Sequence, residues 1–168
     1  GACEAVEYLI AQGHRRIAHI AGPDDHRDAR ARLAGYHDTL AKHRIEADPR
    51  LVVAGDFSES GGLLALNGLL AANLRFTAIF AANDLTAYGA RLALYRRNIR
   101  VPEDISLVGF DDLESSMYTT PPLTTVRQPL YDAGIGIGRR MLAMLAHEQP
   151  EGEVPQLSLI VRESVRLL

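Results

Sequence analysis

The spacing of apolar residues along this chain alternates between two periods. In the first twelve residues the apolar positions lie on one helical face, formed by Ala2, Ala5, Val6, Leu9 and Ile10. Gly13 stands where a glycine commonly ends a helix. A continuous apolar run follows at 17–21 and is closed by Gly22 and Pro23. This change of period predicts a helix, then a buried strand ending in a turn.

The same succession is repeated three more times. Helical periodicity marks 29–40, 63–70 and 85–95, with Ser58 as the N-cap of the second of these helices, and short apolar strands are predicted at 51–54, 76–81 and 105–108. Because the strands are nearly free of charge and alternate with helices, they favour a parallel sheet covered on both faces. The sequence therefore predicts an α/β fold, a three-layer doubly wound parallel sheet.

The last part of the chain departs from this alternation. Two prolines introduce a short strand at 123–126, and Pro129 at the N1 position opens a helix that runs to about His147. A polar loop at 148–155 then leads to a final strand at 157–161.

Composition and charge exclude several classes of protein. A chain of 168 residues fits one domain and can bury roughly 70 % of its unfolded surface. The net charge of −3 comes from 18 basic and 21 acidic residues, which argues against direct binding of nucleic acid. No run approaches 18 uncharged apolar residues, so we expect no membrane span. The single Cys3 fits a reducing cytoplasm, and the absence of an initiating Met predicts a piece of a longer protein.

Polar residues, joined in one case by an aromatic residue, follow each of the first four predicted strands. They are Asp24, Asp25 and His26, then Asp56 and Phe57, then Asn83 and Asp84, then Asp111 and Asp112. The carboxyl ends of parallel strands meet at one edge, where ligands bind in such sheets.

Each of these residues also has a structural interpretation. Asp and Asn after a strand commonly cap the next helix, and Asp84 fits this role best because it directly precedes the periodicity of Leu85. Asp111 is followed by a segment without helical period, which needs no cap. Phe57 either stacks on an apolar sugar or base face or plugs the core beneath its loop, and both alternatives stay open.

The sequence offers no catalytic or metal-binding motif. Neither Ser58 nor Ser60 lies in a nucleophile elbow, and the six histidines form no zinc motif. The glycines of 134–138 lack the dinucleotide-binding spacing and lie inside a predicted helix, where close packing is the better explanation. We therefore expect no catalytic residues, no metal and no cofactor.

Six segments in order resemble the LacI/GalR family of bacterial transcriptional regulators. They are GHRRIAHI at 13–20, RLAGY at 32–36, GDF at 55–57, AIFAAND at 78–84, VPEDISLVGFDD at 101–112 and PPLTTVRQP at 121–129. The resemblance implies the periplasmic binding protein-like I fold of the sensor domain, with a ligand cleft between two subdomains. It places 1–125 and 156–168 in the C-terminal subdomain. It assigns 126–155 to a crossover and a helix of the missing N-terminal subdomain, and implies that the DNA-binding headpiece is absent.

The resemblance also implies roles for single residues. Arg32 falls on the arginine that grips the effector, Asp111 on the carboxylate that accepts hydrogen bonds from it, and Phe57 on the aromatic that stacks over it. Asn83 falls on a polar residue of the cleft. Two further positions, His26 and Asp28, lie in a loop that varies with the effector. They depart from the purine-binding members, and a guanidinium with a carboxylate suits paired hydroxyls, which favours a sugar.

The resemblance implies a sensor whose effector shifts subdomain closure and so controls operator binding by the headpiece. It implies a cytoplasmic homodimer that uses Leu85, Tyr88, Leu92, Leu113 and Tyr118, although burial within the monomer explains part of that stripe equally well. The alternative is a periplasmic sugar-binding protein of a transport system. A helix-turn-helix upstream of Gly1 would favour the regulator, and a signal peptide would favour transport.

Overall fold

The computed structural model describes residues 1–148 and 155–168. Within these residues one sheet has the strand order β2-β1-β3-β4-β5-β6. The strands are β1 (Ile17–Ala21), β2 (Val52–Ala54), β3 (Ala78–Ala81), β4 (Ser106–Asp111), β5 (Thr124–Arg127) and β6 (Ser158–Ile160). All neighbouring pairs are parallel except the last, in which β6 runs antiparallel to β5.

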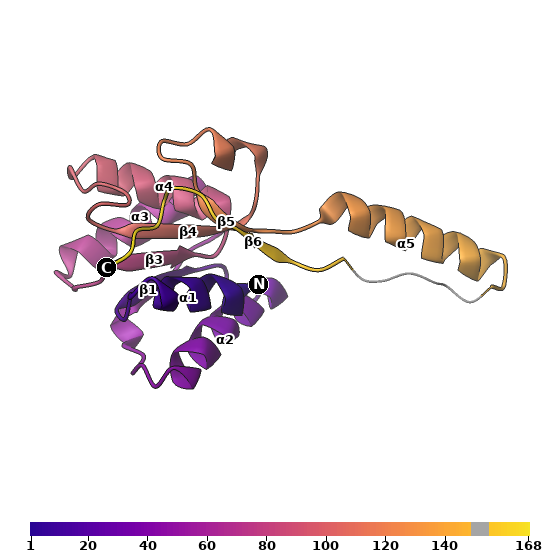
Figure 1. The fold of residues 1–168 in the computed structure, drawn as a ribbon, viewed down its shortest axis with the longest axis horizontal. Coiled ribbons are helices and arrows are strands. Elements are labelled where there is room, and N and C mark those ends of the chain that lie inside the picture. The colour runs from indigo at the N-terminus through magenta and orange to yellow at the C-terminus, as the bar shows by residue number, and fades with distance from the viewer. Residues whose placement is uncertain (149–154) are drawn as a thin grey trace.

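Helices cover both faces of this sheet (Figure 1). One face carries α1 (Ala2–Ala11) and α2 (Arg27–Lys42), and the other carries α3 (Glu59–Ala71) and α4 (Asp84–Tyr95). Two short 3-10 helices, η1 (Pro49–Leu51) and η2 (Glu114–Met117), lie in the connections. The predicted three-layer α/β architecture is confirmed, with the antiparallel β6 added at one edge.

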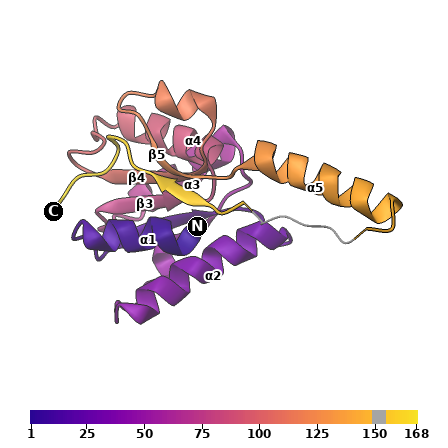
Figure 2. The same ribbon diagram turned by 45° about the vertical axis from the view of Figure 1, so that its right-hand side comes forward.

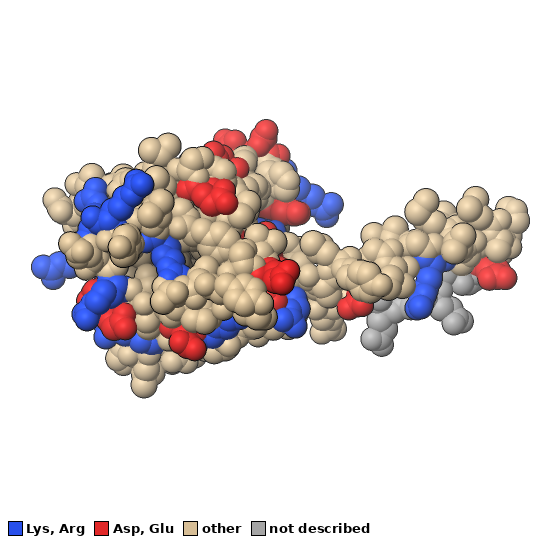
Figure 3. Space-filling view, turned by 90° about the horizontal axis from the view of Figure 1, so that it is seen from above, with Lys and Arg blue, Asp and Glu red and all other residues tan. Residues whose placement is uncertain are grey.

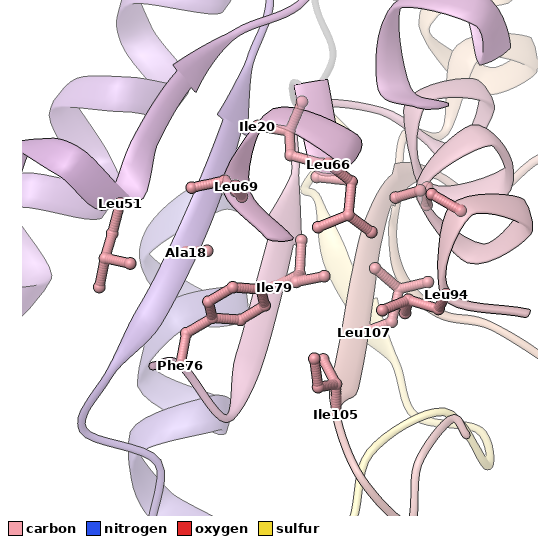
Figure 4. Packing of buried hydrophobic residues seen from close by; sticks show 14 of the residues in the cluster. Ala18, Ile20, Leu51, Leu66, Leu69, Phe76, Ile79, Leu94, Ile105 and Leu107 are labelled. Atoms are coloured by element: carbon pink, nitrogen blue, oxygen red, sulfur yellow. The ribbon is translucent and has the colours of Figure 1, made fainter. Parts of the chain in front are cut away.

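Each face of the sheet has its own hydrophobic core. Alternate residues of β3 supply both cores, because successive side chains of a strand point to opposite faces. Ile79 packs beneath α3 and α4 with Leu66 and Leu94 (Figure 4). Phe80, the next residue along the strand, packs on the α1 and α2 side. All four side chains are fully buried, so the sheet packs against helices on both of its faces.

The helix caps correct one sequence prediction. Ser58 caps α3 as predicted, since its side chain accepts a hydrogen bond from Gly61 N at 3.0 Å. The cap of α4 is Asn83, not Asp84, and its side-chain oxygen accepts from Thr86 N at 2.9 Å. The extended conformation of β3 continues through Asn83, so Asp84 becomes the first helical residue and its side chain is buried.

Helix α5 (Leu130–Leu145) projects away from the sheet (Figures 1 and 2). Pro129 is its N-cap rather than its N1 residue, and no residue of the helix is buried. Added Cβ atoms at its three glycines, Gly134, Gly136 and Gly138, would meet nothing within 4 Å. The close packing expected for these glycines therefore does not occur within the described residues. Most of the predicted polar loop, at 149–154, lies outside the described residues.

In the part of the chain that the structure describes, no helix is both long enough and apolar enough to cross a membrane.

Replacing either of two glycines of α3 by alanine should change the stability of the fold, in opposite directions. A methyl group on Gly62 would collide with the Thr86 carbonyl of α4, whereas one on Gly68 would enter open space. We expect Gly62→Ala to lower the free energy of unfolding by about 1–3 kcal/mol through overpacking. We expect Gly68→Ala to raise it by about 0.5–1 kcal/mol through helix propensity. Urea unfolding followed by circular dichroism measures both, and a Gly62→Ala protein as stable as the wild type would contradict the close α3–α4 contact.

Candidate functional site

A buried arginine is the centre of the polar cluster at the carboxyl edge of the sheet. Arg32 projects from α2, and only 9 % of its surface is exposed. One terminal nitrogen donates to the Ala82 carbonyl just beyond β3 at 2.5 Å, and the other lies 3.5 Å from Asp111 Oδ1 at the end of β4. The guanidinium carbon lies 3.9 Å from the centre of the Phe110 ring, a cation–π distance. Arg32 thus joins α2 to the ends of two neighbouring strands.

Asp111 has one carboxylate oxygen engaged and one available. Its Oδ1 accepts a hydrogen bond from Gln128 Nε2 at 2.5 Å and faces Arg32, while Oδ2 has no partner among the described residues. Burial raises the pKa of the Asp111 carboxyl, although the Arg32 charge and the Gln128 hydrogen bond act to lower it. Since the side chain keeps 21 % of its surface exposed, Oδ2 can accept a hydrogen bond from a bound molecule.

Phe57 lies beside Arg32 rather than in the core. Its ring centre is 5.6 Å from the guanidinium carbon, and the residue is partly exposed and belongs to neither hydrophobic cluster. The ring lies over Gly22, where a Cβ atom would collide with it. Asn83 holds the Phe57 carbonyl with a hydrogen bond of 3.0 Å. Of the two alternatives drawn from the sequence, this position disfavours a core plug.

The remaining predicted residues lie at the margin of this cluster. His26 is exposed and caps α2 by accepting from Asp28 N at 3.3 Å, and its ring meets Phe57 edge-on at 5.2 Å. Asp28 lines a hollow of about 280 Å³ together with Arg32, Phe110 and Gln128. Phe57, Asn83, Asp111 and His26 do not line this hollow. The structure therefore brings all six residues to one edge of the sheet, but only two of them to the same hollow.

Sequence reasoning missed Phe110 and Gln128. Gln128 directly follows β5 and stands at the same sheet edge as the other strand ends. The rule that selected residues after the first four strands would have selected it too. Phe110 carried no polar signal, because it reads as an ordinary apolar strand residue.

The residues predicted for a dimer interface lie on and beside α4. Leu92, Leu113 and Tyr118 are exposed, with 41 %, 36 % and 72 % of their surfaces accessible. Leu85 and Tyr88 are only partly buried, and the Tyr88 hydroxyl already contacts Ser116 Oγ at 2.6 Å within the chain.

No group of three or more His, Cys, Asp or Glu side chains in the described ranges is placed to hold a metal ion.

A buried histidine lies in the core beside Arg32. His19 of β1 is sandwiched between the rings of Tyr36 at 5.2 Å and Phe80 at 4.8 Å, and its Nδ1 contacts the Phe80 carbonyl at 2.9 Å. Its Nε2 has no hydrogen-bond partner among the described residues. Burial lowers the pKa of His19 to about 4, and the positive charge of Arg32 adds to this effect.

Known proteins share the sequence and the fold of this chain. Residues 6–165 match the family described as "Periplasmic binding protein-like domain". The ribose operon repressor of Escherichia coli K12 is 43 % identical over 130 residues, which are 77 % of this chain and 39 % of that protein. The crystal structure of a sugar-binding transcriptional regulator of the LacI family from Escherichia coli, complexed with phosphate, superimposes with a TM-score of 0.93 at 35 % identity. The match covers 99 % of this chain and 60 % of that one.

A dimeric Lac repressor also superimposes with a TM-score of 0.93, at 35 % identity over all of this chain and 62 % of that one. The chain thus spans less than two thirds of the length of each of these relatives. The predicted resemblance to LacI-type regulators is confirmed.

His19 predicts a specific pH dependence of stability. Between pH 6.5 and 4 the unfolded chain protonates this side chain while the folded protein does not, so acidification destabilises the fold. The shift from 6.5 to about 4 corresponds to a loss of about 3 kcal/mol across this range. We expect His19→Leu to show a shallower decline than the wild type when unfolding by urea is measured from pH 7 to 4. Identical slopes in the two proteins would show that His19 does not titrate on unfolding.

Proposed function

This chain belongs to the periplasmic binding protein-like domain family, and we propose from that premise that it is the effector-sensing domain of a LacI-type transcriptional regulator. The observation that carries the proposal is the partly buried Arg32–Asp111 pair at the carboxyl edge of the sheet, with an Asp111 oxygen that has no partner among the described residues. The relatives are named as repressors, which favours a regulator over the transport alternative and gives no support to an enzyme. A regulator of this kind works in the cytoplasm, where its operator lies.

The proposed ligand is a sugar. Arg32 and Gln128 offer N–H donors, Asp111 offers acceptor lone pairs, and such a set matches the alternating donor and acceptor capacity of neighbouring hydroxyls. Phe57 presents a partly exposed ring beside them, which suits the apolar face of a pyranose or furanose. The names of the relatives, a ribose operon repressor and a sugar-binding regulator, point the same way.

In this proposal the six residues have different tasks. Arg32, Asp111 and Asp28 contact the effector, and Phe57 stacks on it. Asn83 acts through Phe57, because its amide holds the backbone of that residue. His26 also acts through Phe57, because its ring packs edge-on against the Phe57 ring.

The proposed mechanism is a shift in the closure of two subdomains. We assign 1–125 and 156–168 to one subdomain, and 126–155 to a crossover and helix that pack on the other. Helix α5 supports this assignment because none of its residues is buried, and Tyr131 and Leu145 leave 80 % and 78 % of their surfaces uncovered. An effector that binds the closed arrangement more tightly increases its population, and a headpiece outside this chain reads that state at the operator.

The proposed regulator is a homodimer. Its interface is formed by the stripe Leu85, Tyr88, Leu92, Leu113 and Tyr118, which lies on α4 and the η2 connection. The exposure of Leu92 and Tyr118 supports this assignment, and one structural relative is a dimeric Lac repressor.

A thermal-shift screen with D-ribose and cellobiose, the sugars that appear in the names of two relatives, tests the ligand site. We expect at least one compound to raise the midpoint of unfolding of the intact protein, because a ligand that binds only the folded state stabilises it. Arg32→Ala and Asp111→Ala should each weaken that binding about 10- to 100-fold, since hydrogen bonds to charged groups contribute about 1.5–3 kcal/mol. Asp104→Ala, which removes an exposed carboxylate paired with Arg100, is the control. Unchanged shifts in both site variants would remove Arg32 and Asp111 from the site.

Sedimentation tests the interface separately. We expect the protein to sediment as a dimer at tens of micromolar, and Leu92→Asp to sediment as a monomer because it places a charge in an apolar contact. Arg44→Asp, which changes an exposed residue after α2 on the opposite face of the sheet, should leave the dimer intact. A wild-type protein that stays monomeric at high concentration would contradict the dimer.

A further inference from the structure

A fully buried carboxylate lies behind the proposed ligand site. Asp84, the first residue of α4, is 0 % exposed and has no salt bridge among the described residues. Its Oδ2 accepts from Leu113 N at 2.8 Å and Ser116 Oγ at 2.6 Å, and its Oδ1 accepts from Thr125 Oγ1 at 2.5 Å. Burial raises the pKa of Asp84, although these three hydrogen bonds lower it. A group so placed connects α4, the link after β4, η2 and β5.

The segment that Asp84 holds is a strained turn. Asp111 and Asp112 have φ values of 115° and 57°, so two consecutive residues with side chains occupy conformations that favour glycine. Such backbone states persist only where the surroundings impose them. Asp84 contacts the end of this turn directly through Leu113 N, and contacts it indirectly through Thr125 of the neighbouring strand β5. The Thr125 hydroxyl oxygen also accepts from Asp112 N at 3.4 Å.

The strand beside this carboxylate is shaped to admit it. A Cβ atom on Gly109 of β4 would collide with Asp84 Oδ1. The glycine therefore lets the carboxylate lie against β4, two residues before Asp111. This contact explains why a conformationally ordinary strand position is occupied by glycine.

We propose that Asp84 is a positioning residue that imposes the turn presenting Asp111 and ties this turn to the α4–η2 surface. The second link passes through Ser116, whose hydroxyl contacts both Asp84 and the Tyr88 hydroxyl at 2.6 Å. The biological meaning of the proposal rests on the proposed function, because Asp111 is there the ligand acceptor and Tyr88 part of the interface. A ligand that moves Asp111 then also moves the surface proposed to contact a second copy.

Asp84→Asn distinguishes the geometry of this group from its charge. An asparagine with its oxygen toward Leu113 and Ser116 keeps both of those hydrogen bonds. Its amide then donates to Thr125, whose hydroxyl can accept as well as donate. We expect Asp84→Asn to keep the turn and Asp84→Ala to lose it.

Nuclear magnetic resonance of the 168-residue chain measures this without any ligand. In Asp84→Ala we expect the Leu113 amide to exchange with solvent about tenfold faster, because it loses its acceptor. We expect the Asp111 Cα chemical shift, which reports its φ, to move toward the value of an unstructured aspartate. In Asp84→Asn the exchange rate of the Leu113 amide should change by less than about twofold. The Asp111 Cα chemical shift should move by only a small fraction of the change expected in Asp84→Ala.

Ser106→Ala is the matched control. It removes a fully buried hydroxyl that accepts from Arg166 N at 3.0 Å at the opposite end of β4. Wild-type values for Leu113 and Asp111 in Asp84→Ala, or equal changes in Asp84→Ala and Ser106→Ala, would overturn the proposal. If Asp84→Ala does not fold, Thr125→Val removes one donor while keeping the side-chain shape, and an unchanged turn in that variant overturns it instead. A negative ligand screen with these shifts as expected would overturn only the proposed function.

Discussion

The burial of the Arg32 guanidinium is the constraint on which this edge of the molecule depends. A charged group can leave water only where partners compensate for the lost hydration. Those partners are the Ala82 carbonyl after β3, and the Asp111 carboxylate and Phe110 ring of β4. They meet because β3 and β4 are parallel neighbours at the centre of the sheet, so their carboxyl ends lie together within reach of Arg32 from α2. The strand order therefore brings together the groups that compensate for burial of the Arg32 charge.

Unusual backbone conformations are also concentrated at the carboxyl edge of the sheet. Among the described residues, Arg44, Asn73, Asn98 and His147 have positive φ two or three positions after the last residue of a helix, where a single left-handed residue commonly ends a helix. The other non-glycine residues with positive φ are Phe57, Asp111 and Asp112, which lie at or just after strand ends at the carboxyl edge. Unusual conformations that do not end a helix are therefore concentrated where the polar cluster lies. This is the distribution expected of a surface that presents side chains rather than of one that closes a core.

The distribution of charge on the face of the chain drawn in Figure 3 differs along its length. The body carries charges of both signs, whereas most of α5 is neither acidic nor basic.

The sequence was sufficient for the fold and for part of the site. Changes of hydrophobic period, with prolines near the end of the chain, predicted the five α-helices and six strands of the described residues in the right order, because a buried strand and an amphipathic helix impose different spacings on apolar residues. The short 3-10 helices η1 and η2 were not predicted. The cap of α4 was misassigned, since adjacent Asn83 and Asp84 both have capping side chains and only the backbone decides where the strand stops. Spacing also could not predict that Asp84 turns inward, because that depends on the approach of Leu113 and Thr125, which lie 29 and 41 residues away along the chain. Phe57 was ambiguous for a similar reason, because its exposure depends on Gly22 of another loop.

The antiparallel pairing of β5 and β6 has a consequence for how the projecting helix is attached. Arg127, where the chain leaves the sheet toward α5, is paired with Ser158, where it returns. Departure and return are therefore separated by a single inter-strand spacing of roughly 5 Å. A folded unit of any size can be carried between two points so close together without lengthening or distorting the sheet. Because β5 is also paired along its whole length with β4, both points of attachment are fixed by the sheet itself.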